Sequence, residues 1–160
     1  MSVTVLNDEE RRARDVQRMR ELTGIDERLI ERLVRGFYSR VREDELLGPV
    51  FDARIQDWEP HLHRMFAFWS SVVLGSGVYS GQPMRLHLPL PVDARHFDRW
   101  LELFEKTARD LFGEQVAQHF IEPARRIATS LELGIASSQG VILGKGERYE
   151  RESLGGNEHD

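Results

Sequence analysis

Residues 58–90 read WEPHLHRMFAFWSSVVLGSGVYSGQPMRLHLPL. The first half carries apolar side chains at helical spacing over a wide face, which predicts a deeply buried helix over 58–74 with Asp57 as its cap. The second half, 75–90, holds three glycines and two prolines, which predicts a long loop with one short helical turn around 84–88. Loops longer than about 12–15 residues are uncommon in compact domains and tend to be functional. This loop is therefore a candidate for a functional site.

Helical periodicity also covers the chain on both sides of this stretch, and no convincing strand alternation appears. The sequence therefore predicts an all-α bundle of about five helices. The expected helices cover residues 8–22, 26–44, 57–74, 93–112 and 114–133. The first carries five acids and five arginines beside a thin apolar stripe, so we expect a solvated helix that lies on the rest of the fold. Pro123 lies inside the last, where a proline usually bends a helix or marks a helix start.

Two segments outside these helices stand out by composition. The connector at 46–51 is apolar, whereas connectors are normally polar, so we expect it to cover a buried feature. Residues 137–160 hold five glycines and few large apolar side chains, which predicts a flexible tail. The predicted organisation is a charged helical extension over 1–25, one domain over 26–136 and the tail over 137–160.

The composition excludes several classes of protein. A chain of 160 residues fits one domain, and a net charge of −5 argues against a nucleic-acid binder, which usually has a basic face. No apolar stretch approaches the ~20 residues of a membrane span, and the N-terminus lacks the layout of a signal peptide, so we expect a cytoplasmic protein. The absence of cysteine excludes disulfides, thiolate ligands and covalent haem attachment.

The histidines are the remaining candidates for chemistry, because phosphate-binding glycine loops, H-E-x-x-H, Glu-x-x-His and G-x-S-x-G motifs are all missing. His61 and His63 point about 200° apart on one helix, so they cannot share a metal. The histidines expected in the tail or facing solvent are His96, His119 and His159. His87 differs because it lies in the apolar, proline-containing loop, where it is either a core residue or an iron ligand.

Short motifs follow one another in a fixed order from about residue 26 to residue 133. They are Phe37-Tyr38, Arg42-Glu43-Asp44, Leu47-Gly48-Pro49-Val50-Phe51, Trp58-x-x-His61, Phe68-Trp69, Leu74-Gly75, Tyr79-x-Gly81-Gln82-Pro83-x-x-x-His87 and Phe97-x-x-Trp100. Each motif is weak, but the ordered set resembles the group III truncated haemoglobins. The resemblance implies a truncated globin fold, in which two helical pairs sandwich a non-covalent haem b.

The resemblance also implies roles for single positions. His87 takes the place of the proximal histidine that binds iron. Tyr38 and Trp100 take distal positions that contact bound ligand, His61 is the distal histidine at the pocket mouth, and Phe51 packs on the porphyrin. Further candidate contacts to the cofactor are Arg64, Met65, Trp69, Leu88 and Phe97.

Each of these assignments has a structural alternative. Tyr38 on an apolar helix face fits a core tyrosine whose hydroxyl bonds a carbonyl. Trp100 and Trp69 lie at helical spacing, which also fits packing alone. Arg64 is considered for a haem propionate, but solvated arginines are the commoner case.

The functional hypotheses follow from the distal donors. The Tyr38 hydroxyl and the Trp100 indole can each donate to a ligand that carries negative charge. Such a bond is worth about 1.5–3 kcal/mol, enough to slow release of dioxygen by roughly ten- to a hundredfold. Slow release suits chemistry at the bound ligand or storage better than rapid delivery of dioxygen. The first hypothesis is nitric oxide dioxygenase or peroxidase-like chemistry, with dioxygen, nitric oxide or carbon monoxide as ligands and a separate reductase. The alternatives are a carrier, store or sensor without turnover, and a helical interaction module without a cofactor.

Overall fold

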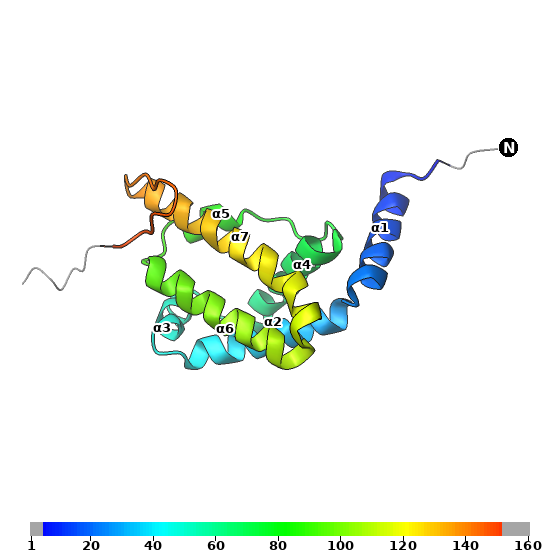
Figure 1. Ribbon diagram of the computed structural model, residues 1–160, viewed down its shortest axis with the longest axis horizontal. Coiled ribbons are helices and arrows are strands. Elements are labelled where there is room, and N and C mark those ends of the chain that lie inside the picture. The colour runs from blue at the N-terminus through cyan, green and yellow to red at the C-terminus, as the bar shows by residue number, and fades with distance from the viewer. Residues whose placement is uncertain (1–4, 152–160) are drawn as a thin grey trace, which may run out of the picture.

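The structure, a computed structural model, describes residues 5–151 and forms seven helices over that range (Figure 1). The helices are α1 (Asp8–Thr23), α2 (Glu27–Glu43), α3 (Leu47–Asp52), α4 (Trp58–Leu74), α5 (Pro83–His87), α6 (Ala94–Phe112) and α7 (Glu114–Ser138). No strand occurs within these described residues, so the all-α prediction is confirmed. Five helices match the predicted ones, and the two short helices, α3 and α5, fall in the connectors.

Two helical pairs form the body of the fold, α2 with α4 and α6 with α7. The pairs meet where α2 packs on α6 and α4 packs on α7. Figure 1 shows α6 and α7 side by side, with α1 extending from one end of the body. The short helices α3 and α5 lie against α6 and α7, respectively, so they close one end of this sandwich.

A stack of aromatic rings runs through the core. Trp69 of α4 stacks on Phe104 of α6 at 4.9 Å between ring centroids, and Phe104 stacks on Trp100 at 5.2 Å. Phe37 of α2 meets both Trp100 and Phe104 edge-on. Each such pair adds about 0.5–1.5 kcal/mol beyond the burial of its area. The stack therefore fixes the position of Trp100 from the core side.

The helix boundaries follow the sequence signals with one exception. The Asp26 carboxylate accepts the Leu29 N–H at 3.0 Å and caps α2, as predicted. Asp57 lies at the predicted cap position of α4, but its side chain makes no capping hydrogen bond. Pro60 at the third helical position has no N–H, which removes one of the two usual donors to a capping side chain. The last helix, α7, continues through Pro123 without a new helix start.

The apolar connector at 46–51 is mostly the short helix α3 rather than a loop. Its Leu47 is buried, which confirms that the connector covers an apolar region. Gly48 permits the tight approach of α3 to the end of α2, because a Cβ there would lie 2.8 Å from the carbonyl oxygen of Arg42. Any larger residue would push α3 away from α2.

The segments at the two ends pack on the body. Helix α1 lies on α4 through the half-buried Val16 and Met19, as expected of a solvated helix. The flexible tail predicted over 137–160 is wrong for its first half, because α7 continues to Ser138 and residues 139–151 fold back with Tyr149 buried. Periodicity could not reveal a segment that is held by one aromatic side chain and a few ion pairs. Residues 152–160 lie outside the described part of the chain.

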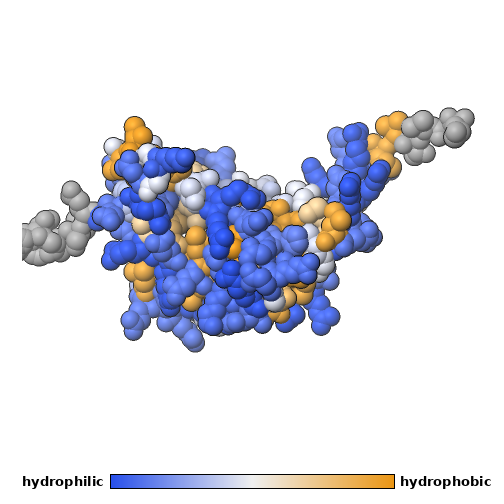
Figure 2. Space-filling model, viewed as in Figure 1, coloured by the Kyte–Doolittle hydropathy of each residue, from blue (hydrophilic) through white to orange (hydrophobic). Residues whose placement is uncertain are grey.

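The face seen in Figure 2 is largely hydrophilic, and hydrophobic surface breaks through it in scattered patches. Among residues 5–151, none of the helices combines the length and apolar character that crossing a membrane requires.

Candidate functional site

An open cavity of about 60 Å³ lies between α3, α6, α7 and the segment that follows α5. The lining residues are Leu47, Val50, Phe51, His87, Leu90, Val92, His96, Phe97, Trp100, Ile127, Ala128 and Leu131. All are apolar or aromatic apart from two histidines. The cavity thus brings together four residues predicted from the sequence, Phe51, His87, Phe97 and Trp100.

His87 is held by its own helix. It ends α5, and its Nδ1 lies 2.6 Å from the carbonyl oxygen of Pro83, the first residue of that helix. A carbonyl can only accept, so Nδ1 carries the proton and Nε2 has a free lone pair. Burial lowers the pKa of His87 below its usual value, although the bond to Pro83 opposes the shift. His87 is therefore a neutral, oriented imidazole, the form that binds a metal.

Tyr38 and His61 meet beside the cavity. Their ring centroids lie 5.1 Å apart at 84°, and the Tyr38 ring also contacts Phe51, which lines the cavity. Tyr38 is only 6% exposed, and burial raises the pKa of its hydroxyl above the ordinary value. The hydroxyl therefore stays protonated and remains a donor.

His61 carries an unsatisfied polar atom. Its Nε2 is buried and has no hydrogen-bond partner within residues 5–151. Burial, aided by the charge of Arg64, lowers the pKa of His61 to about 4. A buried polar atom without a partner costs about 1–3 kcal/mol, and in a native protein it often marks a place for a ligand.

The other predicted residues lie outside the cavity lining. Trp69 is 3% exposed and belongs to the core stack, and Leu88 packs into a small cluster around Val92. Met65 is half-buried against the core, one helical turn from His61. Arg64 is exposed, and its positive charge helps to lower the pKa of His61. Contact between these four residues and a cofactor stays a prediction.

His96 is the residue that sequence reasoning placed wrongly. It was expected to face solvent, yet its side chain is 11% exposed and lines the cavity. Its Nδ1 accepts the Asp93 N–H at 3.1 Å, and the Asp93 carboxylate in turn caps α6. The spacing of Asp93 and His96 is that of a capping box, which was the available signal. His119 is exposed, as predicted.

Comparison with known proteins agrees with this geometry. The model of the bacterial-like globin family matches residues 19–131. A group 3 truncated haemoglobin of Campylobacter jejuni is 34% identical over 113 residues, which cover 68% of this chain and 89% of the relative. The crystal structure of a group III truncated haemoglobin from the same species superposes with a TM-score of 0.63 over 67% of this chain and 88% of that chain, again at 34% identity.

Two more distant crystal structures share the fold. A haemoglobin of Chloroflexus aurantiacus has a TM-score of 0.59 at 24% identity and covers 71% of this chain and 95% of its own. A group II truncated haemoglobin of Bacillus anthracis has a TM-score of 0.60 at 22% identity, and the match covers 81% of this chain and 95% of that chain.

The chain therefore belongs to the bacterial-like globin family, and it binds haem and small diatomic ligands as globins do. Within that family, the resemblance to the group III truncated haemoglobins is confirmed, and so is the truncated globin fold of two helical pairs around a pocket.

The residues of this chain fit a haem. The cavity offers apolar walls, one neutral imidazole with a free Nε2, and on the neighbouring side a buried His61 nitrogen without a partner. Within the described part of the chain, no group of three or more His, Asp or Glu side chains could hold a bare metal ion. A metal held within a macrocycle needs no such group, because the porphyrin supplies the remaining ligands.

Proposed function

We propose that this protein holds haem b without a covalent link, with His87 as its iron ligand. The observation that carries this proposal is the 2.6 Å contact between His87 Nδ1 and the Pro83 carbonyl, which leaves Nε2 free at the cavity. Phe51 and Phe97 form apolar walls beside it. When bound through one imidazole, haem supplies an iron with an open coordination position for diatomic ligands.

The donors of the chain act on the other side of the pocket. Tyr38 is a buried hydroxyl kept protonated by its surroundings, and Trp100 offers an indole N–H that can donate but never accept. His61 adds an imidazole that is neutral at physiological pH. Together, these groups favour a ligand that carries negative charge over a neutral one.

The finer proposal is that the protein turns over nitric oxide or peroxide. Tight retention of dioxygen by three donors suits a reaction at the bound ligand better than rapid delivery. The electrons would come from a separate reductase, since the sequence carries no flavin or nicotinamide motif.

Absorption spectra test the haem assignment. The reconstituted wild-type protein is expected to give a Soret band in its ferric, ferrous and carbonmonoxy forms, and His87→Ala is expected to lose most of its haem. His119→Ala, at an exposed position, is the matched control. Haem retention by His87→Ala equal to wild type would contradict the assignment.

Rapid mixing of the oxygenated protein with nitric oxide tests the turnover. Fast, stoichiometric formation of nitrate, sustained when a reductant is supplied, is the expected result. A slow or absent reaction would contradict turnover and support the carrier.

A further inference from the structure

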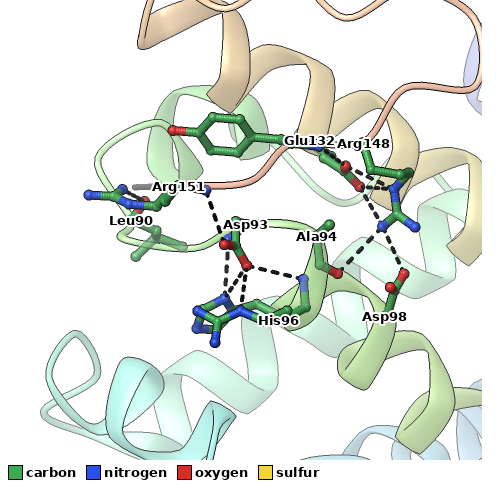
Figure 3. A network of polar contacts seen from close by, with 10 residues as sticks. Leu90, Asp93, Ala94, His96, Asp98, Glu132, Arg148 and Arg151 are labelled. Carbon is green, nitrogen blue, oxygen red and sulfur yellow. Dashed lines mark hydrogen bonds and ion pairs between the residues drawn. The ribbon is translucent and has the colours of Figure 1, made fainter. Parts of the chain in front are cut away.

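The segment at residues 139–151 lies beyond the part of the chain that the globin family model matches. It folds back across the corner between α5 and α6, which comprises residues 88–93 (Figure 3). Tyr149 is the centre of this contact: it is 4% exposed and lies in one apolar cluster with Val92, Phe97 and Ala128. The segment is therefore packed against the fold by a buried aromatic ring.

Hydrogen bonds tie the segment to the main chain of the corner. The Tyr149 carbonyl accepts the Ala94 N–H at 2.7 Å, at the first residue of α6. The Arg151 N–H donates to the Asp93 carboxylate at 3.1 Å, and the Arg151 guanidinium reaches the Leu90 carbonyl at 3.4 Å. Leu90 in turn donates its N–H to the His87 carbonyl at 3.0 Å. A chain of contacts thus links the segment to the residue we assign to iron.

Arg148 and Glu132 anchor the segment to α7. The Arg148 Nε and one Nη lie 3.0 and 2.9 Å from the Glu132 carboxylate, which also accepts the Tyr149 N–H at 2.8 Å. The same guanidinium bonds Asp98 of α6 at 2.7 Å. Glu132 is only 5% exposed. Loss of Arg148 would leave this carboxylate as a buried charge without its cationic partner, which is strongly destabilising.

The apolar cluster around Tyr149 shares residues with the cavity lining. Val92, Phe97 and Ala128 contact the Tyr149 cluster and also line the cavity. The segment therefore supports the outer side of the wall whose inner side faces the cavity. Any shift of Tyr149 moves residues that would contact the cofactor.

We propose that residues 139–151 form a clamp on the His87 side of the pocket. Arg148 and Tyr149 are its positioning residues, and they hold in place the cavity wall and the corner at residues 88–93, which follows His87. This inference rests on the proposed haem binding at His87. The clamp predicts slower haem loss and a single, well-defined orientation of the His87 ring.

The test uses the full-length haem protein with variants at both anchors. Tyr149→Ala removes the buried ring, and Arg148→Met removes the guanidinium. Each substitution is expected to speed the transfer of haem from this protein to excess apomyoglobin about tenfold or more, which corresponds to about 1.4 kcal/mol. Both are also expected to shift or broaden the iron–histidine stretching band in the resonance Raman spectrum of the ferrous form. Arg148→Lys keeps the positive charge but loses the planar guanidinium that bonds both Glu132 and Asp98, so a rate of haem loss between those of wild type and Arg148→Met is expected.

Two controls separate positioning from general stability. Glu150→Gln lies next to Tyr149 but is exposed, and surface changes of this kind stay within about twofold of wild type. Ile25→Val weakens the core at the connection between α1 and α2, at a buried residue that does not line the cavity. It is expected to lower the urea midpoint of the apoprotein without moving the iron–histidine band.

The outcomes distinguish the clamp from the proposed function. If wild-type protein forms no haem complex that depends on His87, the proposed function fails. If that complex forms but Tyr149→Ala and Arg148→Met lose haem as slowly as Glu150→Gln, the clamp is overturned. It is equally overturned if both variants lose haem faster but keep the wild-type band, because the effect is then one of stability alone. Where Arg148→Met does not fold, Arg148→Lys decides by the same two measurements.

Discussion

Replacing Tyr38 with phenylalanine isolates a single hydroxyl. The ring contacts with Phe37, Phe51 and His61 are retained, because phenylalanine has the same ring. Tyr38 is 6% exposed, so a hydrogen bond from its hydroxyl is poorly screened by water. A bond to a charged partner is worth about 1.5–3 kcal/mol, and 1.4 kcal/mol is a factor of ten. Tyr38→Phe is therefore expected to speed dioxygen dissociation by about ten- to a hundredfold.

The assay is stopped-flow displacement of dioxygen by carbon monoxide from the ferrous protein. Tyr79→Phe is the matched control, because Tyr79 packs on Phe68 at 5.2 Å on the loop before α5, whereas Tyr38 packs on His61 and on Phe51 of the cavity wall. The control is expected to keep the wild-type rate. A Tyr38→Phe rate within about twofold of wild type would refute the argument that this hydroxyl donates to the ligand.

Three further predictions concern the same pocket. Trp100→Phe keeps an aromatic ring on Phe104 but removes the indole N–H, so dioxygen dissociation is expected to quicken by about tenfold, as measured in the same assay; a slower rate would contradict a donor role. The pKa of His61 falls from 6.5 to about 4 on folding, so the unfolded chain binds more protons than the native one between these values. The free energy of unfolding of the apoprotein should therefore decrease as the pH falls from 6.5 to 4, and His61→Leu should flatten that dependence in urea titrations; an unchanged slope would show that His61 is not buried in its neutral form. Gly48→Ala places a methyl group 2.8 Å from the Arg42 carbonyl, and the forced shift of α3 is expected to cost about 1–3 kcal/mol in apoprotein unfolding; equal stability would mean that α3 adjusts freely.

The helices and the cavity could be predicted because their signals are local or carried by a motif. The spacing of apolar side chains predicted the five long helices within a few residues, and the Asp26 cap was visible in the sequence. The composition of the 75–90 loop predicted the short helix α5, and the family resemblance pointed to His87, which lines the cavity.

The remaining features depend on contacts between distant segments. His96 looked like a surface residue because its neighbours in the sequence are charged, yet it lines the cavity. Tyr149 looked like part of a glycine-rich tail, and only its packing on Val92, Phe97 and Ala128, which are distant in the sequence, shows why it is buried. The fold brings such residues together, so their contacts cannot be predicted from a local sequence pattern.

The most direct measurement is the ferrous resonance Raman spectrum of His87→Gly, recorded without and with added imidazole. If the His87 Nε2 holds the iron, the iron–histidine band disappears in the variant and a band from free imidazole replaces it, whereas His96→Gln keeps the wild-type band. A wild-type band in His87→Gly, or its loss in His96→Gln alone, would contradict the account.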